Sequence, residues 1–363
     1  MSINPFTPSF GSSPALLAGR DMIIRNIVGG LQNGHGDPNR VVIFSGPRGS
    51  GKTVLLSEIA NKADQFGWIT ANVTTMDGML DDILDQVKEN GRKLLSGKGR
   101  SHITGVNAAG FGFTRTVDAE EKVGWRTQMT RLIKELNENN IGLLITVDEA
   151  NVAVSELRVL VATFQHFVRE KRDVALLMAG LPGKISTILN DDVISFLRRA
   201  FQYKLGLVDF AEVRLAMKKT IEISERDIEK KALDLAVEKT GGFPFLIQLI
   251  GYHIWNQSPN RKRISFKDVE DGVELAKLDM YSMIMETTVK GLSKTDRKFL
   301  LAMAEDDGES VMSDIAKRLG VTQNYASQYR LRLIEQGVIE SVDVGAVAFS
   351  LPMLKDFLLE RYA

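Results

Sequence analysis

The residues best suited to chemistry lie between positions 41 and 54. An apolar run, residues 41–44, leads into a glycine-rich segment that ends in Lys52 and Thr53 at the start of an amphipathic segment. This is the pattern G-x-x-x-x-G-K-[ST] in a strand–loop–helix context, which is typical of a loop that binds phosphate groups. The candidate ligand-binding residues in this loop are Gly46, Pro47, Arg48, Gly49, Ser50, Gly51, Lys52, Thr53 and Val54.

Each residue type in the loop suits phosphate binding. Glycine lets the backbone curl so that its N–H groups point at phosphate oxygens, and the following helix adds the positive end of its dipole. Lys52 is placed to reach the β- and γ-phosphates of a nucleotide, and the Thr53 hydroxyl is placed to ligate Mg²⁺. The alternative is a glycine-rich turn that precedes Lys-Thr by chance, and the flanking strand and helix patterns disfavour it.

A second pair of reactive residues, Asp148 and Glu149, ends the apolar run 142–147. ATP hydrolysis needs two acids of this kind. Asp148 would hold the Mg²⁺ shell, and Glu149 would orient and activate the attacking water. Buried strands also end in acids simply because they reach a solvated edge, but the position about 100 residues after the phosphate loop favours the catalytic interpretation.

The elements that would position these residues alternate between strand and helix up to residue 207. This order predicts a P-loop NTPase core over residues 1–207, built as a three-layer α/β/α sandwich with a parallel sheet. Segment 96–118 interrupts the alternation. Its glycines and the period-two Phe111 and Phe113 predict a β-hairpin insert, which is either an exposed contact element or a hairpin that lies on the core.

Strand signals stop after residue 208. Helices expected near 209–222, 225–239, 243–257 and 265–289 predict an all-helical lid over residues 208–290. Ser224 and Ser265, each followed three residues later by Asp, predict capping boxes at two helix starts. Residues 291–363 show helix–turn–helix and then two short β-runs, which predicts a winged-helix domain.

The composition excludes several classes of function. The chain has no cysteine, which rules out disulfides and thiolate metal sites and fits a cytoplasmic protein. The four histidines are scattered without ligand spacing, and the formal net charge is zero. We therefore expect no histidine metal site, and we do not expect the whole molecule to bind nucleic acid electrostatically. The apolar runs are too short to cross a bilayer, and the N-terminus has no signal-peptide pattern, so no membrane partner is expected.

Taken together, the glycine loop, the Asp148-Glu149 strand, an Arg198-Arg199 pair before a short strand, the lid and the winged helix resemble the AAA+ ATPases of the origin-recognition type and the related STAND switches. The resemblance covers essentially the whole chain. It implies an enzyme that binds ATP and ADP, hydrolyses ATP with Mg²⁺ and uses the cycle to change conformation.

The resemblance also assigns roles to residues outside the two motifs. Gly19 and Arg20 open a helix shortly before the phosphate loop, and this family places such an element against the adenine; the alternative is an ordinary helix start. Arg198 or Arg199 would sense or complete the γ-phosphate site of its own or a neighbouring subunit, whereas a solvated basic helix end is the alternative. Pro244 would pack near the nucleotide, or is simply a proline in the first turn of a buried helix.

The chain departs from the family at two places. The strand 174–180 is followed by Leu181-Pro182, so its tip carries no polar side chain to contact the γ-phosphate, and the lid lacks an arginine at the position of Pro244. We therefore predict slow hydrolysis.

The role of the C-terminal domain has two interpretations. In the first, Gln323, Asn324, Ser327, Gln328 and Arg330 face a DNA major groove. Residues 291–363 hold nine basic and eleven acidic residues, a net charge of −2, and 340–350 holds no basic residue, so we expect binding to double-stranded DNA to be weak and to depend on ATP and self-assembly. In the second, the winged helix folds back on the nucleotide site of a signalling or protein-interaction switch. A metabolite kinase is disfavoured by the lid and the winged helix.

Overall fold

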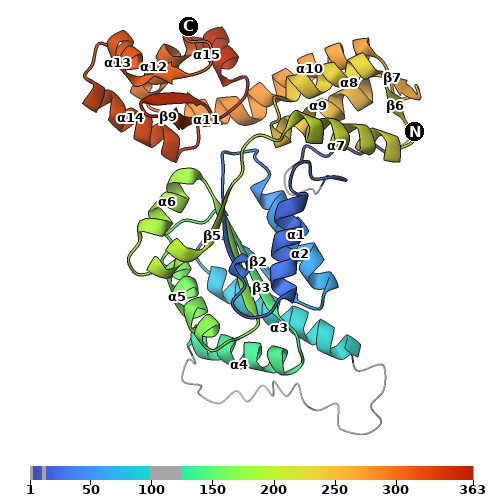
Figure 1. Cartoon of the computed structure of the whole chain (residues 1–363), viewed down its shortest axis with the longest axis vertical. Helices are drawn as coiled ribbons and strands as arrows, with labels where there is room; N and C mark the ends of the chain where they lie inside the picture. The colour runs from blue at the N-terminus through green and yellow to red at the C-terminus, as the bar shows by residue number, and fades with distance from the viewer. Residues whose placement is uncertain (1–2, 10–13, 99–123, 363) are drawn as a thin grey trace.

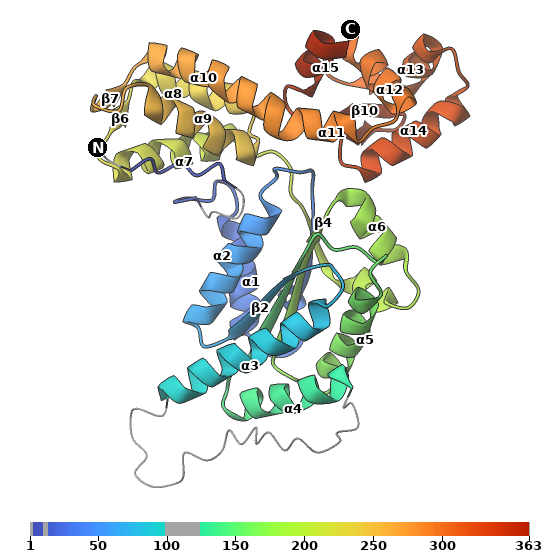
Figure 2. The ribbon, with the colours of Figure 1, turned by 180° about the vertical axis from the view of Figure 1, so that it is seen from behind.

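The computed structural model describes residues 3–9, 14–98 and 124–362. Figures 1 and 2 show an α/β core below a row of helices that lies across the carboxyl edge of its sheet. Of the insert predicted for 96–118, residues 96–98 belong to helix α3 and the rest lies outside the described residues.

The core contains a five-stranded sheet in the order β2-β3-β4-β1-β5, and every neighbouring pair is parallel. Its strands are β1 (Val41–Ser45), β2 (Ile69–Thr74), β3 (Leu143–Asp148), β4 (Val174–Gly180) and β5 (Phe201–Lys204). Only β4 separates β1 from β3. Because parallel strands present their carboxyl ends at one edge, the phosphate loop after β1 and the acids after β3 meet there.

Alternate side chains of each strand face opposite helical layers. Val42 and Phe44 pack with helices on one face, whereas Ile43 packs with those on the other. The first layer contains α1 (Asp21–Gln32) and α2 (Lys52–Gln65). The second contains α3 (Met79–Lys98), α4 (Trp125–Glu138), α5 (Ser155–Arg169) and α6 (Pro182–Asn190). Short 3₁₀ turns, η1 (Pro38–Arg40) and η2 (Ser195–Arg199), precede β1 and β5. The predicted three-layer fold is confirmed.

The segment after β5 is mainly helical, but the short paired strands β6 and β7 depart from the all-helical lid that the sequence predicted. It contains α7 (Phe210–Ile223), β6 (Asp227–Ile228), α8 (Lys230–Thr240), α9 (Pro244–Gln257), β7 (Arg263–Ile264), α10 (Phe266–Met280), a π-helical turn η3 (Tyr281–Met285) and α11 (Glu286–Lys290). The Ser265 capping box is present. The capping box expected at Ser224 is wrong: Ser224 ends α7, and residues 227–228 pair with β7 before α8 starts, because strand pairing satisfies those backbone groups instead.

The C-terminal segment runs helix, strand, two helices, two strands and a last helix. Its elements are α12 (Lys294–Ala304), β8 (Ser310–Val311), α13 (Met312–Leu319), α14 (Gln323–Glu335), β9 (Ile339–Asp343), β10 (Ala346–Phe349) and α15 (Leu354–Tyr362). The strands form an antiparallel sheet in the order β8-β10-β9.

One continuous set of buried residues runs through this C-terminal segment and the helices before it. The ring of Phe357 in α15, for example, meets that of Tyr281 at 5.0 Å between centroids. We therefore treat residues 208–362 as one packed body, called the upper body below.

Candidate active site at the carboxyl edge of the sheet

The loop after β1 needs glycine at several positions for different reasons. Gly49 and Gly51 have φ values of 78° and 85°, a region that other residues rarely adopt. Gly46 has no such φ, but a Cβ added there would lie 2.6 Å from the carbonyl oxygen of Leu205. The loop is thus fixed in a tight curl before α2 begins at Lys52.

Lys52 is the central cation of the site. Its Nζ donates to the carbonyl oxygens of Gly46, at 2.9 Å, and Pro47, at 2.8 Å, and the residue is only 7% exposed. Burial lowers the pKa of Lys52 to about 8, while the nearby Glu149 and Asp148 act in the opposite direction. A buried ammonium held by neutral carbonyls is a strong site for an anion, because an anionic ligand would offset its desolvation.

The two acids after β3 lie beside the phosphate loop. Thr53 Oγ1 donates to Asp148 Oδ2 at 2.5 Å, which brings together two oxygen groups of the kind that Mg²⁺ prefers. These side chains therefore fit a Mg²⁺ ion. Glu149 has a φ of 50°, a strained conformation for a residue other than glycine and one found most often at functional sites. Its backbone N–H donates to Asp148 Oδ1 at 2.8 Å, which helps to hold this turn.

A cavity of about 440 Å³ opens above the loop. The phosphate loop forms its floor, and the other walls come from the N-terminal segment, α9 and the η3–α11 turn. Its lining includes three buried hydroxyl oxygens that have no hydrogen-bond partner among the described residues: Thr7 Oγ1, Ser50 Oγ and Thr288 Oγ1. Orphaned polar atoms around a cavity indicate a polar ligand.

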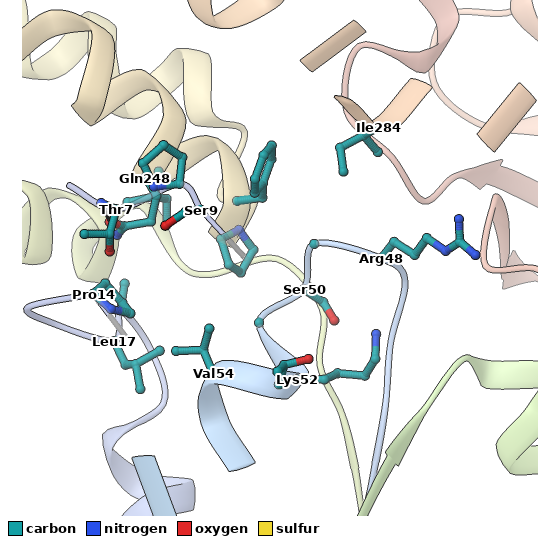
Figure 3. Close-up of a pocket in the computed structure, with 18 of the residues that line it drawn as sticks. Thr7, Ser9, Pro14, Leu17, Arg48, Ser50, Lys52, Val54, Gln248 and Ile284 are labelled. Atoms are coloured by element: carbon teal, nitrogen blue, oxygen red, sulfur yellow. Dashed lines mark hydrogen bonds between the residues drawn. The ribbon is translucent and has the colours of Figure 1, made fainter. Parts of the chain in front are cut away.

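The structure gathers most of the predicted site residues around this cavity. Those that line it are Arg20, Arg48, Gly49, Ser50, Gly51, Lys52, Thr53, Val54, Glu149 and Pro244. Figure 3 shows Ser50 and Lys52 between Val54 on one side and Arg48 on the other. Gly46 and Pro47 contribute carbonyl groups to Lys52 instead, and Asp148 is held behind Thr53. Gly19 adjoins Arg20 and packs against Val208 and Glu212.

Arg20 joins the two halves of the molecule beside the cavity. Its guanidinium donates to the carbonyl oxygen of Gly206 at 2.8 Å, at the connection between the core and α7. Burial lowers the pKa of Arg20, and the carboxylate of Glu212 partly offsets that effect. The Gly19-Arg20 element thus touches both the cavity and the connection before α7.

The arginine pair lies apart from the cavity. Arg198 donates to the carbonyl oxygen of Leu189 at 2.8 Å and to Asp192 at 3.0 Å. Arg199 is exposed, and no described residue forms a hydrogen bond or ion pair with it. Neither arginine lines the cavity, so neither completes this chain's own site in this arrangement.

The upper body touches the phosphate loop directly through the start of α9. The N–H of Phe245 donates to the carbonyl oxygen of Gly49 at 3.2 Å. A Cβ added to Gly49 would lie 2.8 Å from the ring of Phe243, and Pro244 stands at the first position of α9. Pro244, in the first turn of α9, thus lies where that helix meets the loop. Its packing near a nucleotide stays a prediction.

A second contact joins the end of α14 to the core. A Cβ added to Gly183 would lie 2.4 Å from Glu335 Cα, and one added to Gly337 would lie 3.4 Å from Pro47 Cα. Gly337 also adjoins Leu181 and Pro182. The apolar tip of β4, where the sequence lacks a polar residue, is therefore covered by the C-terminal segment.

Sequence reasoning missed the upper wall of the cavity. The missed lining residues are Thr7, Pro8, Ser9, Pro14, Leu16, Leu17, Ala18, Phe245, Ile247, Gln248, Met283, Ile284, Thr287 and Thr288. The first residues are rich in Pro and Ser, a composition that indicates no regular element and no ligand contact. No local pattern marks these residues, because they meet only when the chain folds.

In the described parts of the chain, none of the helices has both the length and the apolar character needed to span a bilayer. Within the same residues, no three His, Asp or Glu side chains gather as a metal-binding cluster.

One protein-family model matches part of the sequence, and solved structures match the fold of the chain. A model for a domain of unknown function, DUF8462, matches residues 282–358. No curated protein matches the sequence. The structure is similar to that of a Walker-type ATPase of Pyrococcus abyssi, with 15% identity, a TM-score of 0.63 and coverage of 94% of this chain and 96% of that one. It is also similar to the ORC2 protein of Aeropyrum pernix, solved as ADPNP and ADP complexes, with 14% identity, a TM-score of 0.62 and coverage of 97% and 95%. The chain therefore shares the fold of these two proteins, and its core is the P-loop α/β fold that its motifs predicted.

Proposed function

We propose that the chain binds ATP with Mg²⁺ and hydrolyses it slowly to ADP and phosphate. The observation that carries this proposal is the buried Lys52 ammonium, which lines the cavity with Thr53 and Glu149, while Asp148 accepts a hydrogen bond from Thr53. Lys52 and the loop N–H groups would bind the phosphates. Thr53 and Asp148 would hold Mg²⁺, which when bound supplies positive charge to the phosphate oxygens. Glu149 would orient a water molecule and accept its proton.

The proposed slow rate of ATP hydrolysis rests on the residues that surround the site. The tip of β4 is apolar and touches Gly337, so it brings no polar side chain to the γ-phosphate. Arg198 is held by Asp192 and by the backbone. Arg198 and Arg199 therefore add no charge stabilisation to phosphoryl transfer at this chain's own cavity in this arrangement.

Exposed Arg199 supports self-assembly through the ATP site, in which it would act on a neighbour. Mixing Lys52→Ala chains with Arg199→Ala chains should then restore part of the lost hydrolysis, because hybrid contacts pair one intact site with one intact arginine. Absence of restoration at every mixing ratio would argue for a monomer.

The conformational part of the proposal rests on the packed upper body. It touches the phosphate loop at Gly49 through Phe245 and at Pro47 through Gly337. A ligand in the cavity lies between these two bodies, so nucleotide exchange would change the angle between them. The domains proposed for this cycle are the core (1–207), the lid (208–290) and the winged helix (291–363).

We propose weak, ATP-dependent association with double-stranded DNA through the C-terminal segment, whose order of helices and strands supports a winged helix. A second candidate, a protein-interaction switch without DNA, is favoured by one observation. The C-terminal segment has four clustered cations, Lys317, Arg318, Arg330 and Arg332. Three of them have partners within the segment: Arg318 with Asp306, Arg332 with Asp296 and Arg330 with the hydroxyl of Ser341. The cysteine-free sequence supports a cytoplasmic location for either function.

The experiment that tests the ATPase proposal follows phosphate release by the purified chain. We expect slow release with ATP and Mg²⁺ and none with a chelator. Thr53→Val removes the hydroxyl but keeps the shape of the side chain, and it should reduce the Mg²⁺-dependent rate. Thr130→Val, on the surface of α4, is the matched control. Release that is absent under all conditions, together with absence of ATP binding, would contradict the proposal.

A further inference from the structure

Arg48 brings a second positive charge to the phosphate end of the cavity. The phosphate-loop pattern allows any residue at this position, so the motif accounts for the backbone of Arg48 and not for its guanidinium. The side chain is exposed, and no described residue forms a hydrogen bond or an ion pair with it. Arg48 lines the cavity together with Lys52 and Glu149. An unpaired guanidinium at the wall of a cavity can therefore meet an anion inside it.

The order of residues along the cavity places Arg48 where the terminal phosphate of a nucleotide would lie. Figure 3 shows Lys52 between Val54 on one side and Arg48 on the other, with Pro14 and Leu17 on the side of Val54. The apolar side chains near Val54 suit the base of a nucleotide, and Lys52 is placed to reach the β- and γ-phosphates. A polyphosphate that runs from Val54 past Lys52 therefore reaches Arg48 last.

The positive charges at this end of the cavity repel each other in the ligand-free protein. Burial lowers the pKa of Lys52 to about 8, and the positive charge of Arg48 adds to that effect. Glu149 and Asp148 offset part of the repulsion, but no acid among the described residues pairs with Arg48. Because like charges that share a cavity are unfavourable, an anion that meets both cations would remove the repulsion.

We propose that the guanidinium of Arg48 binds the terminal phosphate of ATP, and that this side chain makes the chain prefer ATP over ADP. The inference rests on the ATP-binding function proposed above. The fork of N–H donors on an arginine matches two oxygens of one phosphate. ADP ends one phosphate earlier, beside Lys52, and leaves Arg48 without a ligand. Because the contact forms in the bound ground state, it tightens ATP binding without raising the maximal rate, which agrees with slow hydrolysis.

The test measures the equilibrium binding of ADPNP, a poorly hydrolysed analogue of ATP, and of ADP to the full chain with Mg²⁺. Arg48→Gln removes the charge but keeps the backbone N–H groups of the loop. It should weaken ADPNP binding about tenfold, the value of one charge-assisted contact, and should change ADP binding by less than about twofold. Arg48→Lys keeps the charge without the fork, so it should weaken ADPNP binding by only about threefold.

Arg169→Gln is the matched control, because Arg169 is an exposed arginine at the end of α5 and lies outside the cavity. It should leave both affinities unchanged. Without nucleotide, Arg48→Gln should unfold at the same temperature as the wild type, and a lower temperature would indicate a structural role instead. An equal loss for ADPNP and ADP in Arg48→Gln, or no loss for either, would overturn this inference and leave the ATPase proposal standing. Failure of the wild-type chain to bind either nucleotide would overturn the proposed function, and this inference with it.

Discussion

The phosphate loop and the C-terminal segment both present basic side chains, but these side chains differ in burial and in whether a carboxylate pairs with them. Lys52 is buried and held only by two backbone carbonyls. Arg318 and Arg332 are more exposed, yet each is matched to a carboxylate, Asp306 and Asp296 respectively. The difference teaches that the number of cations on a surface says little about anion binding. A cation without a matched acid is poised for an external anion, whereas a paired one contributes to the fold.

The largest effect should follow from Glu149→Gln at the phosphate end. An amide cannot accept a proton from water, so hydrolysis should fall by a factor of about 10²–10⁴. ATP should remain bound, because the phosphate loop is untouched. Phosphate release and equilibrium binding of ATP, measured on the same sample, check both parts. Hydrolysis at the wild-type rate would show that Glu149 is not the base and that the site uses another acceptor.

Lys52→Ala should have the next largest effect. The change removes the unmatched cation, so ATP affinity should fall at least tenfold, roughly the value of a charge-assisted contact. Lys62→Ala is the matched control: it lies on the same helix, where Lys62 pairs with Glu58 at the surface. Unchanged ATP affinity in a folded Lys52→Ala chain would break the comparison, since Lys52 would then behave like the paired arginines.

The free energy of unfolding of the ligand-free protein should depend on the protonation of Lys52. Its folded-state pKa of about 8 lies below the ordinary value of 10.5. The unfolded chain therefore holds more protons between pH 8 and 10.5, and this group makes the free energy of unfolding rise with pH in that window. Below pH 8 the buried charge costs the fold about 3 kcal/mol, which Lys52→Met should recover. Thermal unfolding of the wild type and Lys52→Met at pH 7 and pH 10 measures this; an equal difference at both values would contradict it.

The sequence revealed the phosphate end almost completely because its signals are local. Gly49 and Gly51 need their positive φ values whatever surrounds them, and Lys52 and Thr53 follow directly. The acids Asp148 and Glu149 needed one further step, that parallel strands end at a common edge. β-branched and apolar runs identified those strands, and the parallel sheet brought both motifs together.

The rest of the site depends on contacts that no local pattern encodes. Asn4 meets Tyr252, 248 positions away, so an arm rich in Pro and Ser gave no sign that it lines a cavity. Arg332 meets Asp296, 36 positions away, so a count of charges overestimated the cations available to DNA. The wrong capping box at Ser224 has the same origin, because pairing of β6 with β7 decided where α8 starts.

The paired arginines should behave as structural residues. Asp296 is 2% exposed and also forms the Ser293 capping box. Arg332→Ala would leave its carboxylate without its cation, which should lower the free energy of unfolding by about 1–3 kcal/mol. Lys317→Ala, at an exposed lysine on α13, should change it by less than about 0.5 kcal/mol. Denaturant unfolding of the two variants compares them, and equal stability would mean that the Arg332 pair is as weak as an ordinary surface ion pair.

The smallest effect is expected for the binding of duplex DNA to the C-terminal segment. This prediction tests whether cations that already have partners are unavailable to an external anion. Affinity for DNA comes largely from neutralised phosphates, and each one adds about 0.9 to the salt dependence. Residues 291–363 have a net charge of −2. Arg318 and Arg332 are paired with carboxylates, and Arg330 donates to the neutral hydroxyl of Ser341. Of the four clustered cations, only Lys317 is exposed without a partner among the described residues. A single chain should therefore bind duplex DNA weakly, and ATP should strengthen binding only by bringing several copies onto one duplex.

Titration of duplex DNA with the full chain at low and moderate salt, with ATP, with ADP and without nucleotide, measures this binding. Lys317→Ala should weaken the binding by about twofold to fivefold and flatten its salt dependence by about one phosphate, whereas Lys267→Ala on α10 should not. Tight binding that ignores nucleotide would show that the paired arginines leave their acids for DNA. Absence of binding under every condition would assign the C-terminal segment to the protein-interaction switch.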